Sequence, residues 1–142
     1  MHTLPIQIRF NDIDQMGHVN NAVIMEYFDL GKSVFFTAAG VPPEQGDFTV
    51  VIVHYEVDFM TQIHFRDAIE VRTGVRRFGT KSFAVDQYVV NQKTGQVCAR
   101  CQTVMSGYQR STGRSATIPP DLKQRLGAEE FAAPVRPEIP IG

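Results

Sequence analysis

The sequence predicts an α+β fold in which a five-stranded antiparallel β-sheet wraps around one long central α-helix. Three observations lead to this prediction. Residues 21–39 carry apolar side chains at helical spacing. One short segment before them and four longer segments after them alternate apolar and polar residues, as half-buried strands do. The longer segments are joined by short connections, which require antiparallel neighbours.

The chain begins with a predicted strand and a polar loop. Residues 4–10 alternate strictly, which predicts a half-buried strand whose apolar face includes Phe10. A polar stretch follows, and its Gly17 suits a sharp turn. Asn20 or Asn21 can then cap the helix by accepting a hydrogen bond from a free backbone N–H.

The helix is predicted over residues 21–39, and the glycine and two prolines that follow are a stop signal. Its apolar stripe consists of Ile24, Tyr27, Phe28, Gly31, Phe35 and Ala38. A glycine inside a helix costs about 1 kcal/mol of helix propensity. Because Gly31 lies in the middle of the stripe, we expect the sheet to pass very close to the helix at that position.

Four strands are predicted after the helix. They cover residues 49–59, 68–78, 82–90 and 96–108, and residues 91–95 form the turn between the last two. A single helix covers only one face of such a sheet. The other face is then partly bare, which favours oligomerisation.

The C-terminal region is predicted to add a short helix and an arm. Two prolines favour the start of a helix over residues 119–126. Residues 127–142 are rich in Ala and Pro and are expected to form a loose C-terminal arm. Residues 1–126 are therefore expected to form a single domain, the usual outcome for a chain of 142 residues.

Composition argues against several kinds of partner. The net charge of −1 and the pI near 6.4 give no reason to expect nucleic acid or an anionic membrane surface. No segment approaches the ~20 apolar residues that span a bilayer. The first residues also lack the basic and apolar regions of a signal peptide. These features predict a cytoplasmic protein.

Cys98 and Cys101 form a C-x-x-C pair, a pattern that can mark redox or zinc chemistry. They lie in a predicted strand, where residues three apart point to opposite faces, so their sulfur atoms cannot easily meet. No second Cys or His pair stands nearby to complete four zinc ligands. We therefore expect no metal site.

The polar loop before the helix is the candidate functional site. The first N–H groups of a helix lack intrahelical partners and carry the positive end of its dipole. They therefore favour an anion or an oxygen that gains negative charge. Asp14 lies beside this helix start and can act as a base or a nucleophile. The alternative is a structural role, in which Asp14 only accepts hydrogen bonds from loop N–H groups.

The order of elements and the residues of this loop resemble a known family. The matching residues are Arg9-Phe10-Asn11-Asp12-Ile13-Asp14, Gly17-His18-Val19-Asn20-Asn21 and Glu26-Tyr27-Phe28, with further matches at 55–58, 67–71 and 112–114. The sequence resembles the hotdog-fold acyl-CoA thioesterases of the 4-hydroxybenzoyl-CoA thioesterase type over about residues 4–120. The resemblance implies that the predicted sheet and helix form a hotdog fold.

The resemblance also implies roles for individual residues. Asp14 stands at the position of the catalytic carboxylate, which is a nucleophile or a base on water. The N–H of Asn21 stands at the position that polarises the thioester carbonyl. Beside these residues, His18 either orients the acid, lines the pocket or is a loop histidine with a purely structural role. Asp12 is then expected to brace the loop. The predicted substrate-binding residues are Val19, Asn20, Phe59, Met60, Arg76 and Arg77.

The two arginines are candidates for contacts with CoA phosphates, although solvated strand ends are the commoner role of such residues. The implied reaction is hydrolysis of a small or medium acyl-CoA, or of an acyl carrier protein thioester, to a free acid and a thiol, without a cofactor. Family members place each active site at a dimer interface. A homodimer or a homotetramer is therefore expected.

Two alternatives remain open. A non-catalytic acyl-CoA-binding hotdog protein would keep the pocket and lose the acid, and the presence of Asp14 argues against it. A hotdog hydratase or dehydratase has an Asp-x-Asn-Pro-x-His pattern. Here His18 lies one residue closer to the acid, with neither Asn nor Pro between them, which favours hydrolysis.

Overall fold

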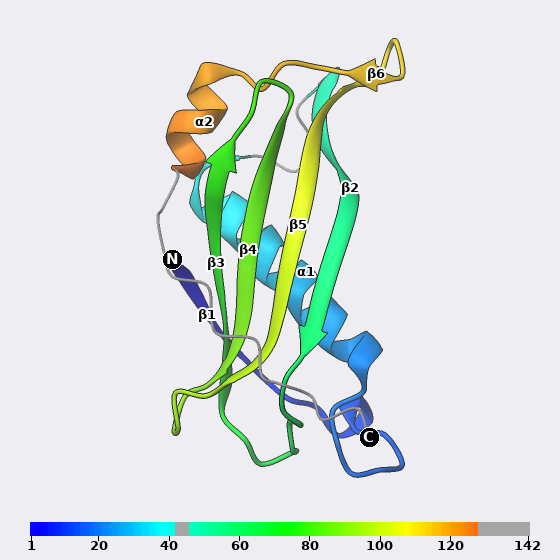
Figure 1. The fold of residues 1–142 in the computed structure, drawn as a ribbon, viewed down its shortest axis with the longest axis vertical. Coiled ribbons are helices and arrows are strands. Elements are labelled where there is room, and N and C mark those ends of the chain that lie inside the picture. The colour runs from blue at the N-terminus through cyan, green and yellow to red at the C-terminus, as the bar shows by residue number, and fades with distance from the viewer. Residues whose placement is uncertain (42–45, 128–142) are drawn as a thin grey trace, which may run out of the picture.

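The computed structural model describes residues 1–41 and 46–127. One long helix crosses one face of a curved antiparallel sheet (Figure 1). The α+β prediction, with five antiparallel strands around a central helix, is confirmed. The elements are β1 (His2–Ile6), the 3₁₀ turn η1 (Phe10–Asp12), α1 (Asn21–Ala38), β2 (Phe48–Phe59), β3 (Ile69–Phe78), β4 (Ser82–Asn91), β5 (Val97–Gln109), β6 (Arg114–Ser115) and α2 (Pro120–Leu126).

The sheet has a simple antiparallel topology. Its strands lie in the order β1-β3-β4-β5-β2, and the short β6, which was not predicted, pairs with the end of β5. β1 and β2 are thus the edge strands. Within the described part of the chain, β2 pairs with β5 alone, so its outer edge is open to a further strand.

The sheet passes very close to α1 at Gly31, as the sequence predicted. A Cβ atom at Gly31 would lie 2.6 Å from Cγ1 of Val71 on β3. Beside it, the buried Gln87 of β4 donates from Nε2 to the Phe28 carbonyl at 2.8 Å and to Oγ1 of Thr73 at 2.9 Å. A side chain at position 31 would therefore push the helix off the sheet and strain these bonds.

The first strand is shorter than predicted. β1 ends at Ile6, which pairs with Ile69, the first residue of β3. Residues beyond Ile6 have no strand opposite them, so the ladder stops there. Phe10 belongs to η1 and is 82% exposed, which makes the prediction of a buried Phe10 wrong.

The buried face of α1 differs from the predicted stripe at two positions. Five of the six predicted residues are buried, but Ala38, the last helical residue, is exposed. Lys32 was not predicted to be buried and is only 4% exposed. It can be buried because its ammonium group contacts the Asp29 carboxylate at 3.2 Å and the Tyr55 hydroxyl at 3.3 Å.

The predicted short C-terminal helix is confirmed as α2, and Leu122 and Leu126 bury its inner face against Phe83 and neighbouring apolar residues. The predicted C-terminal arm covers residues 127–142, of which 128–142 lie outside the described residues, so the arm stays a prediction. In residues 1–41 and 46–127, no helix combines the length and apolar character needed to cross a membrane. The cytoplasmic location also stays a prediction.

Candidate active site

The loop before α1 folds back on itself and brings Asp14 next to His18. Ile13 and Val19 form an isolated antiparallel bridge, and the Asp14 N–H donates to the His18 carbonyl at 2.8 Å. The Gly17 N–H donates to the Asp14 carbonyl at 3.1 Å. Gly17 has a φ of 81°, a left-handed conformation that suits glycine. The turn predicted at Gly17 is confirmed.

The Asp14 carboxylate is held by one of its two oxygens. Oδ1 accepts hydrogen bonds from the N–H groups of Met16 at 2.9 Å and His18 at 3.4 Å. Accepting hydrogen bonds from loop N–H groups is the structural role that was considered as the alternative to catalysis. They leave Oδ2 without a donor among residues 1–41 and 46–127. The exposed Asp14 thus has a fixed orientation and one oxygen available for chemistry.

The start of α1 supplies an unused hydrogen-bond donor. Asn20 caps the helix, because its side-chain oxygen accepts from the Ala22 N–H at 2.8 Å and its carbonyl accepts from the Ile24 N–H at 3.0 Å. Within the described chain, no group accepts a hydrogen bond from the N–H of Asn21. This N–H lies at the positive end of the helix dipole and suits an oxygen that gains negative charge.

Asp12 has a structural role, as predicted. It is 5% exposed, and its Oδ2 accepts from the Arg9 N–H at 2.9 Å and from the Tyr27 hydroxyl at 2.6 Å. Burial and the bond to Asp12 raise the pKa of Tyr27, so its hydroxyl stays protonated and keeps donating. The Asp12 carbonyl also accepts from the Asn20 N–H at 2.9 Å. Asp12 therefore joins η1, the loop and α1.

A cavity of about 350 Å³ lies beside this loop. It is bounded by the loop, by the first turn of α1 and by the end of β2 with the segment that follows it. Six of the predicted site residues line it, namely Asp14, His18, Val19, Asn21, Phe59 and Met60. Asn20 is not among the lining residues, because its side chain is used in the helix cap.

The two predicted arginines lie elsewhere. Arg76 bonds through Nε to Oδ2 of Asp86 at 2.7 Å and through its terminal nitrogen to the same oxygen. This bond to a fully buried carboxylate raises the pKa of Arg76 and ties its side chain to β4. Arg77 is exposed at an irregularity in the β3–β4 pairing. Neither lines the cavity at Asp14, and a contact of either arginine with CoA stays a prediction.

His64 is a neighbour of the site that the sequence did not indicate. Its ring lies edge-on to the ring of His18, with 5.2 Å between centroids. The backbone N–H of His64 donates to Oδ2 of Asp67 at 2.9 Å, and the ring Nδ1 of His64 lies 3.6 Å from the same oxygen. His64 is 46 positions from His18 in the sequence. The Val19 N–H, which donates to the Ile63 carbonyl at 2.8 Å, brings the two segments together.

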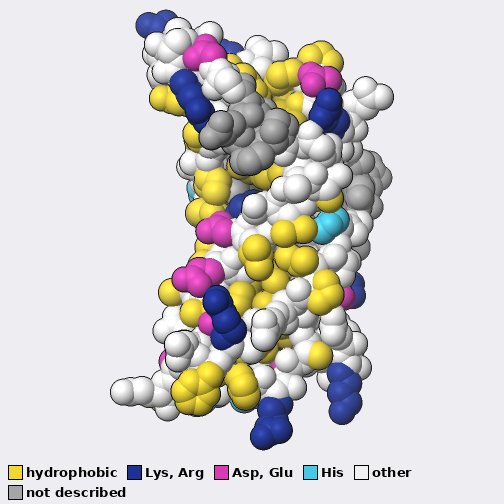
Figure 2. Space-filling model, turned by 180° about the vertical axis from the view of Figure 1, so that it is seen from behind, with side chains coloured by type: hydrophobic (Ala, Val, Ile, Leu, Met, Phe, Trp, Pro, Cys, Tyr) yellow, Lys and Arg dark blue, Asp and Glu magenta, His cyan; other side chains and the backbone are white. Residues whose placement is uncertain are grey.

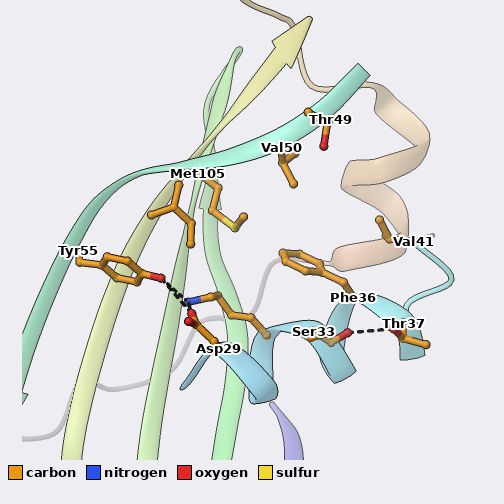
Figure 3. Close-up of a pocket in the computed structure, with 11 residues that line it drawn as sticks. Asp29, Ser33, Phe36, Thr37, Val41, Thr49, Val50, Tyr55 and Met105 are labelled. Atoms are coloured by element: carbon orange, nitrogen blue, oxygen red, sulfur yellow. Dashed lines mark hydrogen bonds and ion pairs between the residues drawn. The ribbon is translucent and has the colours of Figure 1, made fainter. Parts of the chain in front are cut away.

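A second cavity, of about 420 Å³, lies farther along α1. Figure 3 shows Phe36 and Val41 on one side of it and Val50 and Met105 on the other. Tyr55 points across it toward Asp29, and a dashed bond joins them. The sequence did not indicate this cavity, because its walls come from strands and a helix that are distant along the chain.

Comparison with known proteins agrees with the fold and the loop. The family model described as the thioesterase-like superfamily matches residues 8–126, and the chain belongs to this superfamily. Its fold is the hotdog fold of solved thioesterase structures. The chain is 28% identical to a predicted thioesterase from Bacillus stearothermophilus, with a TM-score of 0.78 over 87% of this chain and 92% of that one.

Two further relatives are informative. A thioesterase from Thermus thermophilus, solved in complex with coenzyme A and Zn, is 28% identical, with a TM-score of 0.75 over 89% of this chain and 97% of that one. The uncharacterized protein YsmA of Bacillus subtilis (strain 168) is 20% identical over 121 residues, which are 85% of this chain and 82% of YsmA. In the described part of this chain, no three His, Cys, Asp or Glu side chains are grouped as metal ligands.

Proposed function

We propose that this protein hydrolyses the thioester of a small or medium acyl-CoA to a free acid and CoA. The observation that carries the proposal is that the Asp14 carboxylate and the unused N–H of Asn21 lie at the same cavity. One group can attack or activate water, and the other can stabilise an oxyanion. Membership of the thioesterase-like superfamily supports this choice of reaction.

The reaction begins with the thioester carbonyl oxygen against the Asn21 N–H and the carbonyl carbon facing Oδ2 of Asp14. If Asp14 is a base, it takes a proton from water as the water oxygen bonds to the carbon. The carbonyl electrons move to the oxygen and are stabilised by the helix start. When these electrons return to the carbonyl bond, the C–S bond breaks. The departing thiolate then takes from Asp14 the proton that came from water.

Asp14 can alternatively be the nucleophile. Its Oδ2 then bonds to the carbonyl carbon, the C–S bond breaks, and an acyl–aspartyl anhydride remains. Water cleaves this anhydride to the free acid and the Asp14 carboxylate, and the proton released in this step converts the thiolate to the thiol. Both routes use the fixed orientation that the Met16 and His18 N–H groups give to Asp14. Both yield an acid and a thiol.

The cavity at Asp14 suits an acyl group joined to a polar carrier. Its wall is apolar at Ile24, Phe59 and Ile63, and it is polar at Thr61 and Gln62. The Thermus thermophilus relative was solved in complex with coenzyme A, which supports CoA as the carrier. Our proposal of CoA rather than a carrier protein rests on that complex.

We also propose that the active unit is a homodimer formed through β2. This edge strand exposes apolar side chains, among them Val53 at 59% and Phe59 at 40%. An open edge with exposed apolar residues is a template for pairing with another chain. Because Phe59 lines the cavity at Asp14, a partner along β2 would reach the edge of the site.

The test is a panel of acyl-CoA thioesters, with release of free thiol as the readout. We expect thiol release with some of these substrates and its loss in Asp14→Asn. A hydratase would add water to an enoyl-CoA and release no thiol. A non-catalytic binding protein would bind acyl-CoA and leave it intact. Either result would contradict the proposed hydrolysis.

A further inference from the structure

The two cavities lie in line between α1 and β2. The cavity at Asp14 uses the first turn of α1 and the end of β2, and the second cavity uses the following turns of α1 and the earlier part of β2. Figure 1 shows the start of α1 near the end of β2. Seen from the α1 side, hydrophobic side chains run along the middle of the molecule, and most Lys and Arg side chains lie toward its ends (Figure 2).

A hydrogen-bonded bridge crosses between helix and strand where the second cavity begins. The Tyr55 hydroxyl, from β2, donates to Oδ1 of Asp29 on α1 at 3.0 Å. The Lys32 ammonium lies 3.2 Å from the same Oδ1 and donates to the Tyr55 oxygen at 3.3 Å. It also lies 4.8 Å from the centroid of the Tyr55 ring. Three side chains thus tie the helix to the strand (Figure 3).

Stability alone does not explain this bridge. Burying an ammonium group costs free energy that its ion pair roughly returns, so an apolar residue in place of Lys32 would stabilise the fold as well. The Asp29 side chain is 61% exposed, which weakens its contribution further. A polar bridge at the mouth of a mostly apolar cavity is therefore better explained by a role in selecting which ligands enter the cavity.

Beyond the bridge the cavity is lined mostly by apolar side chains. These are Phe36, Val41, Val50 and Met105, and the hydroxyl residues Ser33, Thr37 and Thr49 are also part of the wall. Such a chamber accepts the end of an alkyl chain, because each methylene that leaves water gains about fourfold in affinity. The other parts of an acyl-CoA are its phosphates and adenosine, and burying several phosphate charges against a mostly apolar wall would cost far more free energy.

We propose that the Tyr55–Asp29–Lys32 bridge sets the length of acyl chain that the enzyme accepts, and that the chamber beyond it takes longer chains only when the bridge opens. This inference rests on the proposed thioesterase function. From Asn21 to Asp29 the helix advances about 12 Å. An extended alkyl chain advances about 1.25 Å per carbon, given C–C bonds of about 1.5 Å at tetrahedral angles. Chains of up to about ten carbons therefore end before the bridge.

The test compares acyl-CoA substrates from about four to about sixteen carbons in the wild type, Tyr55→Phe and Tyr55→Ala. Tyr55→Phe removes the bridging hydroxyl, and Tyr55→Ala also removes the ring. The measured quantity is the ratio of kcat/KM for the longest chains to kcat/KM for the eight-carbon chain. This ratio is independent of the fraction of active enzyme. We expect it to rise at least about tenfold in Tyr55→Ala and less in Tyr55→Phe.

Tyr108→Ala is the matched control, because Tyr108 is a half-buried tyrosine of β5 that lines neither cavity. Its ratio should equal that of the wild type. An unchanged ratio in both Tyr55 variants would overturn the inference, as would a wild type that hydrolyses the longest chains as well as the eight-carbon chain.

Binding of non-hydrolysable S-alkyl-CoA thioethers separates the two proposals. In the wild type, affinity should rise with alkyl length and level off near the bridge, and Tyr55→Ala should extend the rise. If this pattern appears without any thiol release, the hydrolytic function is wrong and the length limit stands. If thiol is released but neither kcat/KM nor affinity depends on Tyr55, the length limit is wrong and hydrolysis stands.

Discussion

Asp12 and Asp14 are separated by one residue, yet their surroundings give them different roles. Asp12 is 5% exposed and accepts from a backbone N–H and from the Tyr27 hydroxyl through one oxygen. Asp14 is exposed and lines a cavity. Only its Oδ1 accepts a hydrogen bond from the loop, so its other oxygen stays available. The first arrangement stabilises the loop, and the second keeps a carboxylate available beside the start of α1.

Asp14→Asn should abolish most of the activity and preserve the fold. The amide oxygen can still accept from the Met16 N–H, so the loop keeps its shape. The negative charge is lost, and losing a general base typically lowers kcat by about 10²–10⁴-fold. Steady-state kinetics and acyl-CoA binding should show low kcat with retained affinity. A variant that keeps more than about a tenth of wild-type kcat would show that Asp14 is structural.

Asp12→Ala should act on stability instead. The Tyr27 hydroxyl and the Arg9 N–H lose their acceptor, and an unsatisfied buried donor costs about 1–3 kcal/mol. Thermal unfolding should show a lower Tm, and the kcat of the folded fraction should fall far less than in Asp14→Asn. An unchanged Tm together with a collapse of kcat would reverse the roles assigned to the two acids.

At the scale of elements, α1 serves both the core and the site. Phe28, Gly31 and Phe35 bury one face against the sheet, while the N-terminal turn holds the Asn21 N–H at the cavity. The close contact at Gly31 fixes the height of the helix above β3. A shift of the helix at Gly31 would therefore also move its first turn relative to the loop of Asp14.

Gly31→Leu should destabilise the protein by overpacking. Even a Cβ atom would lie 2.6 Å from the Val71 side chain, so the helix or the strand must move. Overpacking of this kind costs about 1–3 kcal/mol. Chemical denaturation should report the loss, and Gly31→Ala should show a smaller loss. Equal stability of Gly31→Leu and the wild type would mean that the helix does not pack on β3 at this position.

At the scale of the whole molecule, one helix covers one face of the sheet, and β2 leaves an edge open. The exposed apolar side chains of β2 and the open edge occur together on the strand that borders both cavities. This coincidence is the structural basis for the proposed dimer. Assembly and substrate binding would then depend on the same strand.

Light scattering at micromolar concentration should show at least a dimer. Val53→Glu should shift the protein toward monomer, because a charged residue on an edge strand opposes pairing with another strand. Leu30→Glu is the matched control, on an exposed site of α1 that lines a third cavity beside β1 and neither of the cavities at β2. A fully active wild-type monomer would rule out the proposed dimer.

The extent of correct prediction varies along the chain in a physically consistent way. The ends of the four long strands after α1 were predicted to within one residue, because period-two alternation is a local signal. β1 was misplaced because its end depends on where β3 begins, 63 positions after Ile6. Lys32 was missed because its burial depends on the Tyr55 hydroxyl of β2, which accepts its hydrogen bond and is distant along the chain, as well as on the Asp29 carboxylate one helical turn away.

The sequence by itself determined the α+β plan, the turn at Gly17 and the close approach at Gly31, and the resemblance of its loop motif to a known family predicted different roles for Asp12 and Asp14. The first three follow from spacing or residue type, where backbone geometry acts locally. Only the tertiary structure decided that His64 lies beside His18, that Arg76 is committed to Asp86, and that Tyr55 reaches Asp29. These contacts join residues distant along the chain, and their positions depend on how the sheet curves around α1.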